Sequence, residues 1–395
     1  MSAEEKYELI TRGLEEVLNG DIIKAILAEG KSPKGYLAHI GYFVPLTKVA
    51  DFLQAGVETT IFLGDIHAFL DNMKAPLELV EYRTKYYRFV LTAVFKSLGI
   101  PTNKLKFALG SDHQLTREYN MDNYRLCATV TEHDAKKAGA EVVKQVESPL
   151  LSGLVYPGMQ ALDEQYLGVD FQFGGVDQRK IFTFAELYLP RLGYAKRAHL
   201  MNAMVPGLAG GKMSSSDPNS KIDFLDAPEV NGILSFVEAV LIPISQLRLE
   251  NIKQKGSILE AASGGDLKPF ASDDAPEGTV FSVVRDDKFG GSLHYSSYDE
   301  LKNDFAAKKL HPKDLKAAIA DAINKLLDPI RKAFMDDEEA QRIEKLAYPD
   351  PNAKEKKLKK PKAHRSPAAA LNTVQAVDGV PPEVNAVANQ DEHRE

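Results

Sequence analysis

The stretch from Val205 to Ser216 combines residue types that suit a polyphosphate. Three glycines leave its backbone unusually free, namely Gly207, Gly210 and Gly211. One cation and three hydroxyls follow directly, namely Lys212, Ser214, Ser215 and Ser216. Backbone N–H groups and hydroxyls of such a loop can donate hydrogen bonds to phosphate oxygens while the ammonium acts as a point charge. A solvated surface loop is the alternative for a Gly-Lys-Ser run. Only the rest of the sequence can distinguish a phosphate-binding loop from a surface loop.

A second group of polar residues follows helical spacing. Tyr156, Gln160 and Asp163 stand at i, i+4 and i+7, which places a phenol, an amide and a carboxylate on one helix face. This face suits the wall of a small polar pocket. The spacing alone leaves a solvent-facing stripe equally open.

Two polar residues follow a glycine turn. Asp177 and Gln178 come directly after Gly174-Gly175, where a ligand could approach the backbone closely. Their side chains could accept from a ribose hydroxyl and an ammonium group. A helix N-terminal cap is an equally good interpretation of Asp177.

A helix is also expected to begin near His39 and Gly41, so that His39 could donate to a phosphate while Gly41 leaves room for a flat base. No Ser/His/Asp arrangement or metal-ligand spacing stands out in the sequence. The single cysteine, Cys127, lies in Tyr-Arg-Leu-Cys-Ala and is expected in the core. The candidate chemistry is therefore nucleotide binding without covalent catalysis.

Strands and helices must position these groups. Short apolar runs predict strands over residues 59–63, 105–109, 169–173 and 198–201. Helical patterns alternate with them, notably over residues 77–98 and 181–187. Such alternation predicts an α/β fold with a parallel sheet covered by helices on both faces. Ligands bind beyond the carboxyl ends of such strands, where Asp65 falls and where the loop carrying Lys212 should arrive.

The remaining chain is interpreted more coarsely. Helices are expected over residues 7–18, 22–27 and 43–53, and a mostly helical insertion over residues 112–155. No strand is expected between the loop 30–35 and His39. Beyond Asp226 helices are expected over residues 231–241 and 312–334, with a short strand over residues 280–284. The segment 349–395 is Lys-, Ala- and Pro-rich without apolar period, so it should be a disordered tail.

Composition limits the class of protein. The 395 residues are 44% apolar, which is ordinary for a globular protein. One cysteine fits a reducing compartment, and no apolar run reaches bilayer length or resembles a signal-peptide core, so we expect a cytosolic protein with no membrane partner. The net charge of −7 argues against a general coat for nucleic acid. The Lys354–Arg365 block could nevertheless attract phosphate, or be only a solvated tail.

Several motifs resemble one family. Lys212-Met-Ser-Ser-Ser216 matches the KMSKS-type loop of class I aminoacyl-tRNA synthetases, and His39-Ile-Gly-Tyr42 resembles their HIGH motif. Three longer motifs resemble eukaryotic cytosolic tyrosyl-tRNA synthetases, and they begin at Asp65, Tyr156 and Gln172. The resemblance covers about residues 7 to 350. It implies a Rossmann-like catalytic domain at 1–226 with a dimer-forming insertion at 112–155, a helical anticodon-binding domain at 227–348 and the tail.

The resemblance also implies roles for individual residues. Tyrosine would be held by Tyr156, Gln160, Asp163, Gln178 and Asp65, with Asp163 taking the phenol hydroxyl. ATP would be held by His39, Gly41, Asp177, Lys212, Met213, Ser214, Ser215 and Ser216. His39, Lys212, Ser214 and Ser215 would stabilise the phosphates during catalysis. The implied activity is tyrosine–tRNA ligation with ATP and Mg²⁺, through tyrosyl-adenylate, by a homodimer that charges tRNA(Tyr). A tryptophan-specific relative would lack an acid facing a phenol, so Asp163 argues against it.

The chain departs from the family pattern in two places. The family carries a strand and turn of the form Tyr-Trp-Gly-Thr-Ala-x-Thr-Gly-x-Pro before its HIGH-like motif, whereas this chain has no tryptophan and only a short path from Gly30 to His39. Tyr36 is expected to lie too close to His39 to replace the family's tyrosine. A lysine-rich helix is also missing after Asp226. The alternative function is therefore a catalytically impaired tRNA-binding or regulatory relative, which lacks the first strand and part of the ATP cradle.

Overall fold

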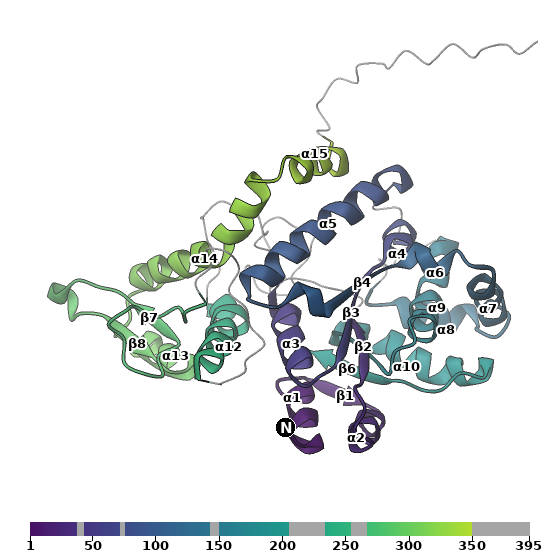
Figure 1. Ribbon diagram of the computed structural model, residues 1–395, viewed down its shortest axis with the longest axis horizontal. Coiled ribbons are helices and arrows are strands. Elements are labelled where there is room, and N and C mark those ends of the chain that lie inside the picture. Colours follow the sequence, from purple (N-terminus) through teal and green to yellow (C-terminus); the bar gives the residue numbers. More distant parts are fainter. Residues whose placement is uncertain (38–42, 72–75, 143–149, 205–233, 254–266, 350–395) are drawn as a thin grey trace, which may run out of the picture. The chain divides into compact units, whose positions relative to one another are not determined.

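The computed structural model describes residues 1–37, 43–71, 76–142, 150–204, 234–253 and 267–349 (Figure 1). The chain divides into two compact units, Met1–Asp350 and Pro351–Glu395, and every described residue lies in the first. The predicted tail beyond residue 349 and the predicted domain boundary at 226 lie outside the described residues. Within the described part, every helix is too short or too polar to cross a membrane.

Six strands form one sheet in the spatial order β1-β6-β5-β2-β3-β4. The strands are β1 (Glu16–Leu18), β2 (Lys34–Leu37), β3 (Glu58–Leu63), β4 (Leu105–Leu109), β5 (Phe171–Gly175) and β6 (Ala198–Asn202). All neighbours are parallel except β1, which pairs antiparallel with β6. The predicted α/β fold is confirmed, and the four predicted strands are β3 to β6.

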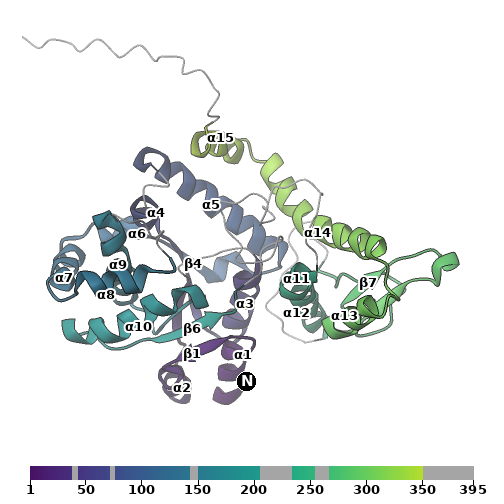
Figure 2. The same cartoon turned by 180° about the vertical axis from the view of Figure 1, so that it is seen from behind.

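Helices cover both faces of the sheet (Figures 1 and 2). One face carries α1 (Ala3–Thr11), α3 (Phe43–Gln54) and α5 (Leu77–Ser97), and the other carries α7 (Arg117–Cys127), α8 (Glu132–Gly139), α9 (Leu151–Tyr166) and α10 (Arg179–Tyr188). The first face is apolar, because the ring of Phe52 on α3 packs edge-on against Phe171 and Phe173 of β5 at 5.4 and 5.3 Å. The helix α2 (Gly20–Ala28) packs beside α1, and α4 (Asp65–Leu70) and α6 (Gly110–Gln114) follow the carboxyl ends of β3 and β4.

A strand occupies the stretch before His39, where the sequence predicted none. Residues Lys34–Leu37 pair in parallel with β3 on one side and β5 on the other, so β2 lies in the middle of the sheet. The prediction was wrong because it allowed too little room between the loop and His39, whereas four extended residues span about 13 Å and suffice to pair on both sides. The edges of the sheet are β1 and β4.

The predicted helix over residues 7–18 is only partly correct. The helix α1 ends at Thr11, and Gly13 adopts a left-handed φ of 68° that breaks the helical repeat. Residues Glu16–Leu18 then form β1. Apolar spacing alone could not reveal this change, because the short strand depends on pairing with β6, which lies far away in the sequence.

The insertion predicted over residues 112–155 is mostly helical in its described part. The side chains of Thr116 and Thr131 cap α7 and α8 by accepting hydrogen bonds from backbone amides of their first turns. Cys127, predicted to be a core residue, is instead exposed at the end of α7. The buried side of α7 carries Leu126, and the next residue of a helix points about 100° away from it.

The described chain resumes at Leu234 with mostly helical structure. Its elements are α11 (Leu234–Phe236), a π-helical segment (Val237–Leu241), α12 (Ile242–Lys253), β7 (Phe281–Val283), β8 (Leu293–Tyr295), α13 (Tyr298–Ala306), α14 (Pro312–Met335) and α15 (Glu338–Ala347). The predicted helices are confirmed from residue 234 onward, and the short strand is β7. Of these elements, α14 and α15 pack on α5, where Ser97 Oγ donates to the carbonyl of Leu326 in α14 at 2.7 Å.

Candidate active site

The predicted polar face of α9 is buried. Tyr156, Gln160 and Asp163 are 3%, 1% and 0% exposed, which excludes the solvent-facing alternative. The helix α7 packs closely on another side of α9, where a Cβ at Gly158 would lie 2.8 Å from Leu126 Cδ2. The three side chains therefore point into the protein between α9 and its neighbours.

Asp163 is the most densely hydrogen-bonded of these residues. Its Oδ1 lies 2.8 Å from His113 Nε2, 2.9 Å from Gln114 Nε2 and 3.1 Å from the hydroxyl of Tyr119. Its Oδ2 lies 2.8 Å from His67 Nε2 and 3.1 Å from Gln114 Nε2. These partners come from α4, α6 and α7. Three elements thus converge on one carboxylate of α9.

The surroundings keep Asp163 ionised. Burial by itself would raise the pKa of this carboxyl, but hydrogen bonds and charge from His113 and His67 outweigh burial and lower the pKa. An ionised carboxylate only accepts, so both Nε2 atoms must carry the hydrogens. Its Oδ2 has one short bond and one longer, shared bond, which leaves capacity for a further donor. A phenol hydroxyl of a substrate is a donor of the required kind.

Tyr36 of β2 contacts α9 beside this cluster. Its side chain is fully buried, and its hydroxyl donates to the carbonyl of Gln160 at 3.3 Å. Burial, followed by the negative charges of Asp163 and Glu164, raises the pKa of its phenol well above the ordinary value. Tyr36 is thus a protonated donor beneath the polar face of α9.

The glycine turn after β5 brings a second pair of predicted residues to this cluster. Gln160 Nε2 donates to Gln178 Oε1 at 3.2 Å, and Gln178 is 2% exposed. A Cβ at Gly174 would lie 3.0 Å from Gln178 Cγ, and one at Gly175 would lie 2.6 Å from Asp177 Oδ1. Both glycines are therefore needed to bring these side chains close to the backbone. Asp177 lies within the 3₁₀ turn Val176–Gln178 and does not cap α10, whose N-cap position is Gln178.

Tyr156 lies close enough to both Asp163 and Asp177 to be affected by their charges. Burial, and then the charges of Asp71, Asp163 and Asp177, raise the pKa of its phenol above the ordinary value. Its ring also packs against that of His67 with centroids 4.6 Å apart. Tyr156 therefore remains a neutral phenol surrounded by carboxylates, which is an environment that favours an ammonium group.

Asp65 lies at the carboxyl end of β3 as predicted, and its contacts are with the backbone. Its Oδ1 accepts from the amides of Ile66 at 2.9 Å and Ser111 at 2.8 Å. The carboxylate thereby ties the start of α4 to α6, which carries two of the partners of Asp163.

The structure thus gathers Tyr156, Gln160, Asp163 and Gln178, with Asp177 beside them. Apart from Asp65, the remaining predicted residues lie outside the described part of the chain, and they are His39, Gly41, Lys212, Met213, Ser214, Ser215 and Ser216. Sequence reasoning also missed the partners of Asp163, which are His67, His113, Gln114 and Tyr119. Only His67 gave a signal, because it lies two residues after Asp65 within the motif that begins there.

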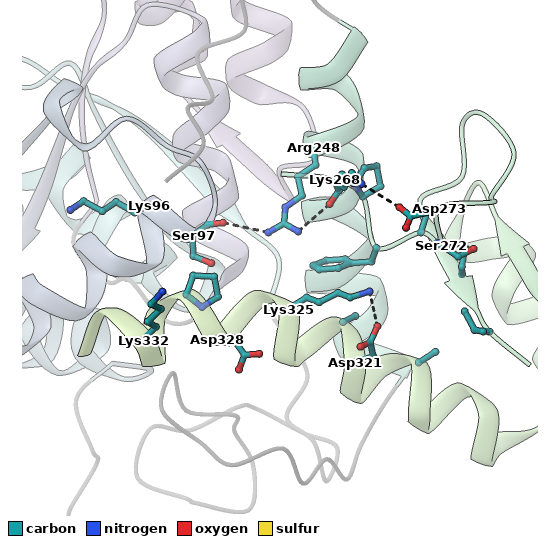
Figure 3. Close-up of a pocket in the computed structure, with 18 of the residues that line it drawn as sticks. Lys96, Ser97, Arg248, Lys268, Ser272, Asp273, Asp321, Lys325, Asp328 and Lys332 are labelled. Atoms are coloured by element: carbon teal, nitrogen blue, oxygen red, sulfur yellow. Dashed lines mark hydrogen bonds and ion pairs between the residues drawn. The ribbon is translucent and has the colours of Figure 1, made fainter. Parts of the chain in front are cut away.

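A separate cleft of about 890 Å³ lies between α5, α12 and α14 (Figure 3). The guanidinium of Arg248 spans it, donating to the carbonyls of Lys268 at 3.2 Å and Ser97 at 3.4 Å. On α14, Lys325 pairs with Asp321 at 2.8 Å. None of the described residues predicted to bind tyrosine or ATP lines this cleft, so it is not part of the candidate active site.

Known proteins of one family are similar to this chain. The family model described as tRNA synthetases class I (W and Y) matches residues 24–236. The cytoplasmic tyrosine–tRNA ligase of Danio rerio is 51% identical over 376 residues, which cover 89% of this chain and 64% of the relative. The cytoplasmic tyrosine–tRNA ligase of Saccharomyces cerevisiae is 51% identical over 386 residues, which cover 91% of each chain. The chain thus spans about two thirds of the length of the fish relative and nearly all of the yeast relative.

A solved structure agrees with these relatives. Tyrosyl-tRNA synthetase from Archaeoglobus fulgidus, crystallised with L-tyrosine, matches with a TM-score of 0.65 and 34% identity, over 84% of this chain and 99% of that one. The family model covers more than half of the present chain, and the yeast relative is covered almost completely. The chain therefore belongs to the class I tRNA synthetases of the tryptophan and tyrosine type, and within them to the tyrosyl-tRNA synthetases.

Proposed function

We propose that the protein is a tyrosine–tRNA ligase of the cytoplasm, which makes tyrosyl-adenylate from tyrosine and ATP and transfers the tyrosyl group to the 3′ end of tRNA(Tyr). The observation that carries this proposal is the ionised, fully buried carboxylate of Asp163 with capacity for one more donor. A site that binds a phenol hydroxyl through this hydrogen bond rejects phenylalanine, because the buried acceptor would then lack its partner.

The amino-acid pocket is proposed around the described cluster. Asp163 would accept the phenol hydroxyl of tyrosine, and Tyr156, Gln160 and Gln178 would hold its ammonium group, with Asp65 at the same edge of the sheet. The raised pKa of Tyr156 and its carboxylate neighbours support a cationic group at this place. The carboxylate of the bound tyrosine is already a nucleophile, so activation requires no general base.

ATP is proposed to bind as its Mg²⁺ complex beyond the carboxyl ends of β5 and β6. Asp177 would hold the ribose. The phosphates would be held by residues outside the described part of the chain, which are His39, Gly41, Lys212, Met213, Ser214, Ser215 and Ser216. In-line positioning and charge stabilisation by His39, Lys212, Ser214 and Ser215 can supply the rate, since phosphoryl chemistry of this kind depends mainly on them.

The partners proposed are tRNA(Tyr) and a second copy of this chain. Residues 1–226 would form the catalytic domain, 227–348 would read the anticodon, and the Lys-rich tail at 349–395 could add affinity for RNA. The insertion at 112–155 would form the subunit contact. In support, it exposes large apolar side chains, with Leu115, Met121, Tyr124 and Leu151 exposed to 67%, 52%, 64% and 78%.

Tyrosine-dependent exchange of pyrophosphate into ATP tests the proposal. The chain should catalyse this exchange with tyrosine and not with phenylalanine, and Lys212→Ala should lower kcat by about 100-fold or more with little change in the KM for tyrosine. Charging of tRNA(Tyr) should follow. Absence of exchange in a folded protein that still binds tRNA would establish the catalytically impaired alternative, although the presence of β2 removes one reason for expecting it.

A further inference from the structure

A buried polar row crosses the sheet beneath α9. Tyr36 of β2 is paired in register with Gln172 of β5, and Gln172 is paired with His199 of β6. Register partners project from the same face of a sheet, and all three side chains are fully buried. The row faces α9, because Tyr36 contacts the carbonyl of Gln160 and His199 contacts Glu164. The sheet therefore carries titratable groups directly under the proposed tyrosine pocket.

His199 is the end of this row and is enclosed on every side. Its Nε2 lies 2.8 Å from Glu164 Oε1 of α9, and its ring stacks on Phe182 of α10 with centroids 4.7 Å apart. Its Nδ1 lies 3.6 Å from Glu186 Oε1, which is too long for a hydrogen bond but close enough for ionic attraction. Asn19 fixes the same oxygen of Glu186 from 2.7 Å. The imidazole thus lies between two carboxylates.

The charges around His199 favour an imidazolium. Burial alone would lower the pKa of this ring, but the charge and hydrogen bond of Glu164, and then the nearby carboxylate of Glu186, raise it to about 9. The proximity of His199, opposed by burial, lowers the pKa of Glu186, and the charge of Lys196 lowers it further.

Two further charged groups act on Glu186, namely Arg179 and its ion-pair partner Glu16. From the sheet, Gln172 and Tyr36 contribute neutral side chains to the surroundings of His199.

Glu164 directly follows Asp163 in α9, and neither is exposed. Two adjacent buried carboxylates oppose each other's ionisation unless each has a compensating partner. Asp163 has His67 and His113, whereas the charged partner recorded for Glu164 among the described residues is His199. Both carboxylates also act on the hydroxyl of Tyr36, which lies between them and the sheet.

We propose that His199 is a positioning residue for tyrosine recognition: as an imidazolium it neutralises Glu164, so that the neighbouring Asp163 remains an ionised acceptor for the substrate phenol. This inference rests on the proposed function. It assigns His199 no contact with substrate, and it predicts that the residue affects tyrosine binding through charge.

A charge-compensation experiment tests this role. The variant His199→Gln removes the cation and should raise the KM for tyrosine about tenfold in pyrophosphate exchange, with the KM for ATP and kcat within about twofold. The double variant His199→Gln/Glu164→Gln removes both charges and should return the KM for tyrosine to within about threefold of wild type. The exposed His311→Gln, outside the proposed catalytic domain and subunit contact, serves as the matched control. A double variant as impaired as His199→Gln, or a single variant with an unchanged KM, would overturn the proposal.

A second measurement needs no substrate and separates this inference from the proposed function. A histidine whose pKa rises from about 6.5 to about 9 on folding stabilises fully below pH 6.5, and this stabilisation is lost as pH rises through 9. The thermal unfolding midpoint of wild type should therefore fall relative to that of the double variant between pH 6.5 and 9. A constant difference across this window would refute an imidazolium at His199. A wild-type protein without exchange activity that shows this pH dependence would refute only the proposed function.

Discussion

Replacing Gly35 by alanine tests whether β2 is the central strand beneath the site. Gly35 pairs with Phe171 of β5, and a Cβ at this position would lie 2.2, 2.4 and 2.7 Å from three ring carbons of Phe171. The ring cannot move aside freely, since it is fully buried and packs against Phe52. Overpacking of this kind costs typically about 1–3 kcal/mol. We expect the upper end of this range, because the overlap is with a ring held on its other side.

The assay is urea unfolding followed by circular dichroism at 222 nm, because the chain contains no tryptophan. Phe171→Leu relieves the overlap, so the double variant Gly35→Ala/Phe171→Leu should be more stable than the sum of the two single effects predicts, by at least about 1 kcal/mol. Lys34→Ala, at the exposed neighbouring position, should stay within about 0.5 kcal/mol of wild type. If Gly35→Ala is as stable as Lys34→Ala, the ring of Phe171 does not lie over β2 and the central position of this strand is refuted.

Two other substitutions test the site and its support. Asp163→Asn should raise the KM for tyrosine about 100-fold or more, because an amide presents a donor to a group of donors. Pyrophosphate exchange at varied tyrosine concentration measures this KM. A change below threefold would mean that Asp163 does not accept the phenol. Ser97→Ala removes the hydrogen bond to Leu326 that joins α5 to α14. Urea unfolding should show a free energy of unfolding about 1 kcal/mol lower than that of wild type. An unchanged value would show that this bond does not hold the two helices together.

The sequence predicted the long and periodic elements best. The helix over residues 312–334 and the strand over residues 59–63 carry apolar patterns that local spacing reveals. Three short strands escaped prediction, since β1 and β8 have three residues each and β2 has four, and each forms only by pairing with another strand. Their identity follows from pairing, which no local pattern encodes.

The candidate site was predictable to the same extent. The shared face of Tyr156, Gln160 and Asp163 follows from helical spacing. The donors that surround Asp163 could not be found in this way, because His113 and His67 lie 50 and 96 residues earlier in the chain. The position of Tyr36 beneath α9 could not be predicted from its distance to His39 along the sequence, because its direction is set by the register of β2 with β5.

The four donors around Asp163 all precede it in the chain. Synthesis proceeds from the N-terminus, and segments fold in that order where they can. The helices α4, α6 and α7 are therefore made before α9, and the loops that must close span 44 to 96 residues. Until α9 docks, Asp163 is not in place to accept hydrogen bonds from these donors; once it docks, the floor of the pocket forms in a single step. Competence to bind the amino acid should therefore appear late in folding and all at once, when the last of these four helices is in place.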